Sequence, residues 1–174
     1  MDVGLKLPAW FERHISNEAS KDKMKPSDRG GQLIGVVISL IVALYFTSLY
    51  SSNSSFFTSN FSAPVAIMFF GIAYFGIIPP LLKLIIGRKN STRPLDVILS
   101  ILMLIALVWF LTIFPFDFKH LADALPSSLQ FLLSWISDGL VKALMVLGIV
   151  VSIIIIPYTT LLYLGVRMKL SRPA

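Results

Sequence analysis

The sequence IIPPLLKLIIGRKNSTR, residues 77–93, brings a hydrophobic segment to its end and then supplies a cluster of basic side chains. The cluster consists of Lys83, Arg88, Lys89 and Arg93. In membrane proteins, Lys and Arg that flank hydrophobic segments collect on the cytoplasmic side. The stretch therefore predicts that the chain crosses a membrane and that its middle lies in the cytoplasm.

The composition supports a membrane-embedded chain. Of the 174 residues, 56% are hydrophobic and only 14% are charged, whereas a soluble domain carries about 25% charged residues. Four apolar segments are long enough to cross the roughly 30 Å of hydrocarbon as α-helices. We therefore predict an all-α integral membrane protein with four transmembrane helices in two hairpins, forming one domain of residues 32–166, with spans at about 32–50, 65–86, 95–114 and 139–164.

The distribution of Lys and Arg predicts the orientation of these spans. The connection 51–63 has no basic residue, and the connection 115–138 has only Lys119, with Lys142 just inside the fourth span. The other thirteen Lys and Arg lie in the leader, in the central loop and in the tail 167–174. We expect both termini to be cytoplasmic and the protein to be in the cell membrane, with these determinants of topology: Arg88, Lys89, Arg93, Arg167 and Lys169. Because the cations flank apolar segments, they indicate contact with the lipid bilayer and not with nucleic acid.

The leader, residues 1–31, has two parts. In the first, an apolar face repeats at helical spacing through Leu7, Trp10, Phe11 and Ile15, which predicts a short helix lying in the membrane interface; a frayed terminus is the alternative. The second part, residues 17–31, is rich in charge and contains helix-breaking residues, Pro26, Gly30 and Gly31. We expect this second part to be a solvated tether.

Prolines mark the second and fourth spans. Pro79 and Pro80 lie near the end of the second span and Pro157 lies in the fourth, so we expect them to kink or interrupt these helices. In both spans two isoleucines precede the proline, and a glycine, Gly87 or Gly165, follows eight residues later. This pattern raises the hypothesis that the two hairpins are a duplication, as occurs in transporters.

The two connections opposite the basic loops have features of their own. Residues 115–138 contain two amphipathic patterns, 118–125 and 129–136, which predict a loop lying on or dipping into the outer membrane interface. Asn53 and Asn60 begin N-glycosylation sequons. They are acceptor sites if the loop faces a glycosylating compartment, and chance matches in a loop rich in Ser and Asn otherwise.

The strongest candidates for chemistry are Asp117, His120 and Asp123, spaced three apart. On a helix they share one face and could hold a metal ion or relay a proton. The alternative is a solvated polar face with Asp117 as a helix N-cap. Asp138 and Lys142, four apart, are predicted to pair across one turn of the fourth span.

Function is predicted less sharply than topology. The chain has no cysteine, no ionisable residue in the central third of a span, and no HExxH, GxSxG or glycine-rich phosphate motif. We predict a non-catalytic accessory or scaffold subunit without a cofactor, acting through helix contacts with other membrane subunits or with itself. Gly35 and Ser39, four apart in the first span, would allow close approach of another helix. The alternatives are a small oligomeric transporter or channel and a membrane-embedded enzyme with an outer-face site.

Overall fold

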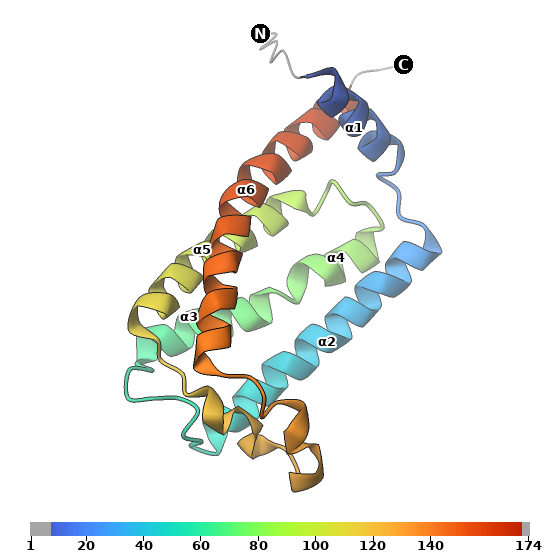
Figure 1. Cartoon of the computed structure of the whole chain (residues 1–174). Coiled ribbons are helices and arrows are strands. Elements are labelled where there is room, and N and C mark those ends of the chain that lie inside the picture. Colours follow the sequence, from blue (N-terminus) through green and yellow to red (C-terminus); the bar gives the residue numbers. More distant parts are fainter. Residues whose placement is uncertain (1–7, 172–174) are drawn as a thin grey trace.

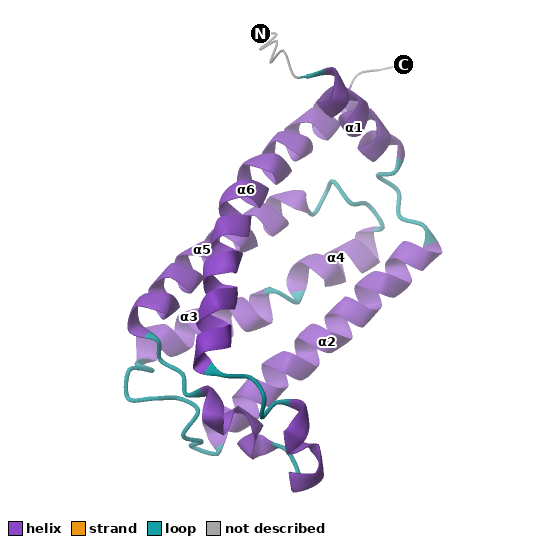
Figure 2. Cartoon of the chain, viewed as in Figure 1, coloured by secondary structure: helices purple, strands orange, loops and turns teal. Residues whose placement is uncertain are grey.

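The computed structural model describes residues 8–171, and this part of the chain is helical without any extended strand (Figures 1 and 2). In chain order the elements are α1 (Ala9–Ser20), α2 (Pro26–Ser51), α3 (Ala63–Phe75), α4 (Ile78–Ile86), α5 (Arg93–Ile113), the 3-10 helices η1 (Phe118–Ala124) and η2 (Ser127–Leu132), and α6 (Asp138–Ser171). The prediction of an all-α chain is confirmed for these residues.

Four helical segments are long and apolar enough to cross a membrane, as predicted: α2, α3 together with α4, α5, and α6. Their apolar side chains are mostly exposed on the protein surface, as is typical of helices that face lipid. The 34 residues of α6 extend about 51 Å at 1.5 Å per residue, well beyond a hydrocarbon core of about 30 Å. The excess length leaves α6 a segment on which other parts of the chain can pack.

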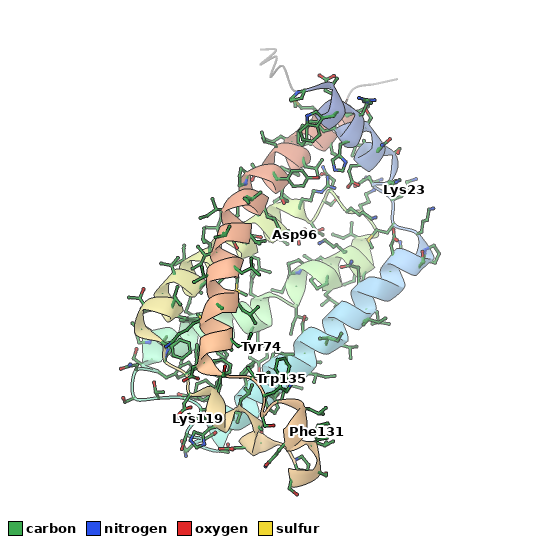
Figure 3. The ribbon with its side chains drawn as sticks, in the orientation of Figure 1. Lys23, Tyr74, Asp96, Lys119, Phe131 and Trp135 are labelled. Carbon is green, nitrogen blue, oxygen red and sulfur yellow. The ribbon has the colours of Figure 1, made fainter. Side chains whose placement is uncertain are left out.

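The spanning helices form a row with α2 and α6 at its edges. Helix α6 packs along α5, α5 packs on α3, and both α3 and α4 pack on α2. Helix α1 crosses the C-terminal part of α6, and its linker leads back to the start of α2 (Figure 1). The row has two different ends, which Figure 3 marks with Lys23 and Asp96 toward one end and Lys119, Phe131 and Trp135 toward the other.

One end of the row, here called the aromatic end, is held together by the connections 52–62 and 114–137. Phe56 and Phe116, 1% and 6% exposed, stack with their ring centroids 5.5 Å apart. The backbone N–H of Asp117 donates to the carbonyl of Phe56 at 2.8 Å, and that of Thr58 donates to Pro115 at 3.1 Å. Further rings surround this pair, namely Phe46, Phe57, Phe61, Phe69, Phe110 and Phe118. Aromatic packing therefore fixes the connection 52–62 against the start of the connection 114–137.

The expectation of a tether from residue 17 to residue 31 is wrong in its bounds. Helix α1 continues to Ser20 and α2 already begins at Pro26, so only residues 21–25 connect them. Pro26 occupies the first turn of α2, where its missing N–H is not needed. Gly30 and Gly31 lie inside the helix, and the cost of about 1 kcal/mol per glycine is evidently smaller than the gain from continuing the helix into its apolar turns.

Helix α1 forms as predicted, but its apolar face contacts protein. Phe11 and Ile15 are buried against Leu162 and Val166 of α6. Trp10 is 62% exposed and remains available to a membrane surface. Leu7 lies outside the described residues.

The prolines act differently in the two spans. The second span breaks at Gly76 and Ile77, between α3 and α4, and Pro79 and Pro80 follow in the first turn of α4. A proline disrupts the turn before it, because its ring meets the carbonyl four residues earlier and it has no N–H to donate. Helix α6, by contrast, continues through Pro157, so the chain is not interrupted there. A kink at Pro157 stays a prediction.

The glycines that motivated the duplication hypothesis also differ. Gly87 ends α4 in the left-handed region, with φ of 68°, a conformation that favours glycine. Gly165 is inside α6 and is buried beneath Ile15 of α1. The corresponding positions of the two hairpins therefore do not share a backbone geometry.

Candidate functional site

The end of the row opposite the aromatic end, here called the basic end, is built where linker 21–25 meets the loop 87–92. The backbone N–H of Met24 donates to the carbonyl of Gly87, and that of Lys89 donates to the carbonyl of Asp22, each at 2.9 Å. The Asp22 carboxylate also accepts from the backbone N–H of Asn90 at 2.8 Å. Asp22 and Asn90 are 7% and 6% exposed, so these polar groups are buried and satisfied by one another.

Three ion pairs join separate elements at the basic end. Lys83 of α4 pairs with Asp96 of α5 at 2.8 Å. Lys89 of the loop pairs with Asp28 of α2 at 3.1 Å. The guanidinium of Arg93 contacts the carboxylate of Glu18 on α1. Of the predicted topology determinants, Arg93 therefore joins α1 to α5, and Lys89 joins the loop 87–92 to α2.

Arg93 is the most enclosed of these cations. Its side chain is 10% exposed, and its second terminal nitrogen donates to Oδ1 of Asn90 at 3.0 Å. A guanidinium with two fixed acceptors is held rigidly. The Arg93 side chain is therefore held in place, whereas the side chains of Lys83 and Lys89, at 21% and 35% exposed, remain accessible to solvent.

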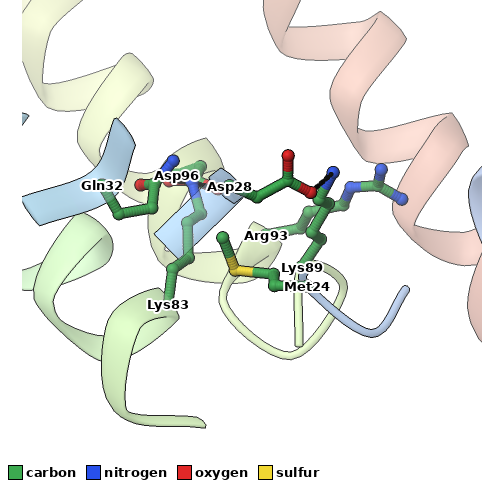
Figure 4. A pocket seen from close by; sticks show the side chains of 7 residues that line it. All are labelled: Met24, Asp28, Gln32, Lys83, Lys89, Arg93 and Asp96. Atoms are coloured by element: carbon green, nitrogen blue, oxygen red, sulfur yellow. Dashed lines mark hydrogen bonds and ion pairs between the residues drawn. The ribbon is translucent and has the colours of Figure 1, made fainter. Parts of the chain in front are cut away.

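These side chains line a partly open cavity of about 360 Å³. Figure 4 shows that its lining comes from the linker, α2, α4, the loop and α5, and consists of Met24, Asp28, Gln32, Lys83, Lys89, Arg93 and Asp96. The lining has three cations, two carboxylates and one amide, so it is built for polar or charged groups and not for an apolar ligand.

Charge is divided unequally between the two ends. Within residues 8–171 the basic end has eleven Lys and Arg and five Asp and Glu, whereas the aromatic end has two basic and three acidic residues. Arg88, Arg167 and Lys169 also lie at the basic end, with the other predicted topology determinants. Arg167 donates to the hydroxyl of Tyr163 at 3.3 Å, and the ammonium of Lys169 contacts the hydroxyl of Ser16 on α1. The basic end therefore has a surplus of positive charge that attracts anions.

At the aromatic end, the structure separates the three residues proposed as metal ligands. Asp117 caps η1 by accepting from the backbone N–H of Lys119 at 3.1 Å. His120 and Asp123 contact one another at 2.9 Å and are both exposed. No group of three potential ligands close enough to hold a metal ion occurs within residues 8–171. The observed geometry is that of the alternative, a capped turn with a solvated polar face.

Asp138 and Lys142 have different partners from those predicted. The Asp138 carboxylate accepts from the backbone N–H of Phe118 at 2.8 Å, which fixes η1 to the start of α6. The ammonium of Lys142 lies 4.0 Å from the ring centroid of Phe114, in a cation–π contact. The predicted pair is not among the ion pairs of the described chain.

The two sequon asparagines lie in the connection 52–62 and differ in their contacts. Asn53 has a positive φ of 50° at the turn after α2 and is exposed. The side-chain amide nitrogen of Asn60 donates to the carbonyl of Ile113 at 3.2 Å. The nitrogen that would carry a sugar at Asn60 is therefore already engaged, whereas that at Asn53 has no partner among the hydrogen bonds of residues 8–171.

Sequence reasoning missed the acidic partners at the basic end: Glu18, Asp22 and Asp28. The sequence contained a signal for ion pairing, because these acids alternate with lysines in the leader. A solvated tether does not require such alternation. Sequence reasoning also missed the contact between the hydroxyls of Thr47 and Tyr74, 2.7 Å apart, which joins α2 to α3 close to the break at Gly76.

No protein family, curated protein or solved structure matches the chain.

Proposed function

We propose that the protein is a non-catalytic accessory or scaffold subunit of the cell membrane, which acts through helix contacts with other membrane subunits or with copies of itself. Both termini and the basic end would face the cytoplasm. The proposal is supported by the edge helix α2, whose side chains leave open a surface that suits a further helix.

The open surface of α2 combines small and large residues. An added Cβ at Gly31 or Gly35 would meet no atom within 4 Å, so another backbone could approach closely there. Helices in membranes associate at such small residues, because dispersion contacts and not water exclusion drive their packing. Eight large apolar side chains around this surface are 43–61% exposed: Leu33, Ile34, Val37, Ile38, Leu40, Ile41, Val42 and Leu44. A facing helix would bury part of this set.

The decisive variant is Gly35→Leu, which fills the site of close approach with a branched side chain. The matched control is Gly71→Leu on α3, where an added Cβ also meets nothing within 4 Å. The protein is purified in mild detergent, and its mass and its cross-linked partners are measured. We expect the wild type and Gly71→Leu to be associated and Gly35→Leu to be dissociated. A wild-type protein that is strictly monomeric and free of partners would refute the proposal.

A second candidate function, a small oligomeric transporter, is favoured by the break between α3 and α4. Pro79 and Pro80 cannot donate hydrogen bonds, so the carbonyls of Phe75 and Gly76 lose their usual partners near the middle of a span. Broken helices at this depth form the ion and substrate sites of many transporters.

The transporter hypothesis is tested by measuring solute flux into proteoliposomes. If the break carries transport, flux should be lost in the double variant Pro79→Ala, Pro80→Ala. It should be retained in Pro157→Ala, because α6 is already continuous at that proline. The absence of wild-type flux for ions, amino acids, sugars and nucleosides would argue against transport.

A further inference from the structure

The cavity at the basic end lies where the chain leaves the apolar segments. Lys83 is in the last turns of α4, Asp96 is in the first turn of α5, and Asp28 is in the first turn of α2. In a protein whose apolar helices cross a bilayer, this level is that of the lipid headgroups, where phosphates meet Lys and Arg.

The cations of the lining and the positive charge of the basic end around it favour an anion over a cation. Three cations face two carboxylates in the cavity, and the whole basic end has a large surplus of Lys and Arg. A phosphate has several acceptor oxygens and can accept charge-assisted hydrogen bonds from more than one cation. Arg93 is held by both Glu18 and Asn90. Lys83 and Lys89 each pair with one carboxylate, Asp96 or Asp28, so they are the cations that can share or exchange that partner for a ligand.

The ion pair between Lys89 and Asp28 is the one most easily exchanged. It is the longest of the three pairs at 3.1 Å, and its side chains are the most exposed, at 35% and 38%. Exposed pairs of this kind contribute little to stability, because water competes for both charges. A phosphate entering the cavity can therefore take Lys89 from Asp28 at a small cost.

We infer that this cavity binds the phosphate group of an anionic phospholipid, with Lys89 and Lys83 as the donors and Asp28 as a competitor for Lys89. The inference does not depend on the proposed scaffold function. It concerns a ligand site at the basic end, whereas the scaffold function rests on the open surface of α2.

The experiment measures lipid retention by native mass spectrometry. Full-length protein in mild detergent is supplied with phosphatidylglycerol or with phosphatidylcholine as the neutral comparison. Lys89→Gln should reduce retention of phosphatidylglycerol about tenfold, the loss expected for one charge-assisted hydrogen bond. Arg88→Gln is the matched control, because it removes the same charge from an adjacent exposed residue that does not line the cavity.

Asp28→Asn separates a ligand site from a purely structural ion pair. It frees Lys89, so it should raise retention about threefold, the effect expected for one exposed competing charge. If the pair were only structural, Asp28→Asn and Lys89→Gln would break it equally and retention would change in the same direction. This opposite response also keeps the inference testable if Lys89→Gln folds poorly.

Further arms identify the source of the phosphate. Inorganic phosphate and glycerol phosphate are added separately and binding is followed by the thermal unfolding midpoint. A rise in the midpoint that Lys89→Gln abolishes would support the same phosphate chemistry with a soluble ligand. Equal retention of phosphatidylglycerol and phosphatidylcholine, or equal losses in Lys89→Gln and Arg88→Gln, would overturn the inference.

Discussion

Replacement of Ile15 by alanine should release α1 from α6. Ile15 is 6% exposed and is packed against α6 beside Gly165. The substitution removes three buried carbon atoms, worth roughly 2.4 kcal/mol at about 0.8 kcal/mol each, within the usual range for large-to-small changes. At about 1.4 kcal/mol per factor of ten, the undocked population should rise about 50-fold.

Hydrogen exchange of the α1 amides measures this release. A helix of 12 residues is marginal when isolated in water, so the amides of undocked α1 should exchange rapidly. Trypsin gives an independent readout at Lys21 and Lys23 in the linker. The matched control is Ile34→Ala, the same deletion at a side chain that is 61% exposed on α2, and it should leave exchange of α1 unchanged.

The contact with Gly165 provides a second check of the same docking. An added Cβ at position 165 would lie 2.5 Å from Cδ1 of Ile15, so Gly165→Ala forces that side chain to move. In the background of Ile15→Ala this clash is absent and the effects should be less than additive. If Ile15→Ala leaves the exchange of α1 at the wild-type rate, the membrane holds α1 and the contact with α6 does not.

Two other predictions concern the aromatic end. Phe56→Ala should destabilise the protein by about 3–5 kcal/mol, because the Phe56 ring is 1% exposed and packed among other aromatic rings. The control Phe131→Ala, at a side chain that is 66% exposed, should cost about 0.5 kcal/mol or less. Thermal unfolding in detergent compares the two variants, and equal effects would contradict the aromatic core. Asp138→Ala should lower the free energy of unfolding by about 1–3 kcal/mol, because it leaves the backbone N–H of Phe118 without its acceptor. Asp123→Ala, at an exposed position, should change the free energy of unfolding little. The same thermal unfolding assay compares them, and an Asp138→Ala variant as stable as the wild type would show that this hydrogen bond is not needed.

The helices could be predicted from the sequence because a span imposes a simple requirement. Each crossing needs about 20 apolar residues, and this requirement is readable in a window of sequence. Helix α2 begins six residues before the first predicted span, because Gly30 and Gly31 were expected to break any helix. The effect of a proline on its span was only partly predictable. Pro79 and Pro80 together end a helix near Gly76, while the single Pro157 is accommodated inside α6.

The candidate site could be predicted only in part. Its cations were found because they are clustered in sequence. Glu18 and Asp28, which pair with Arg93 and Lys89, come from the leader, as does Asp22, which accepts from the backbone N–H of Asn90. Pairing between segments this far apart depends on how the helices pack, and no local period reveals it. Asp138 shows the same limit, because a backbone N–H in η1 competes with the neighbouring Lys142 for its carboxylate.

The orientation of the chain is the claim on which the cytoplasmic placement of the basic end depends. The chain has no cysteine, so a single introduced cysteine reports one position without background. Ser59→Cys lies in the connection at the aromatic end and Ser91→Cys lies in the central loop at the basic end, and both positions are exposed. Sealed cells are treated with a maleimide that cannot cross membranes, before and after permeabilisation. Position 59 should react in sealed cells and position 91 only after permeabilisation; the reverse pattern would contradict the orientation.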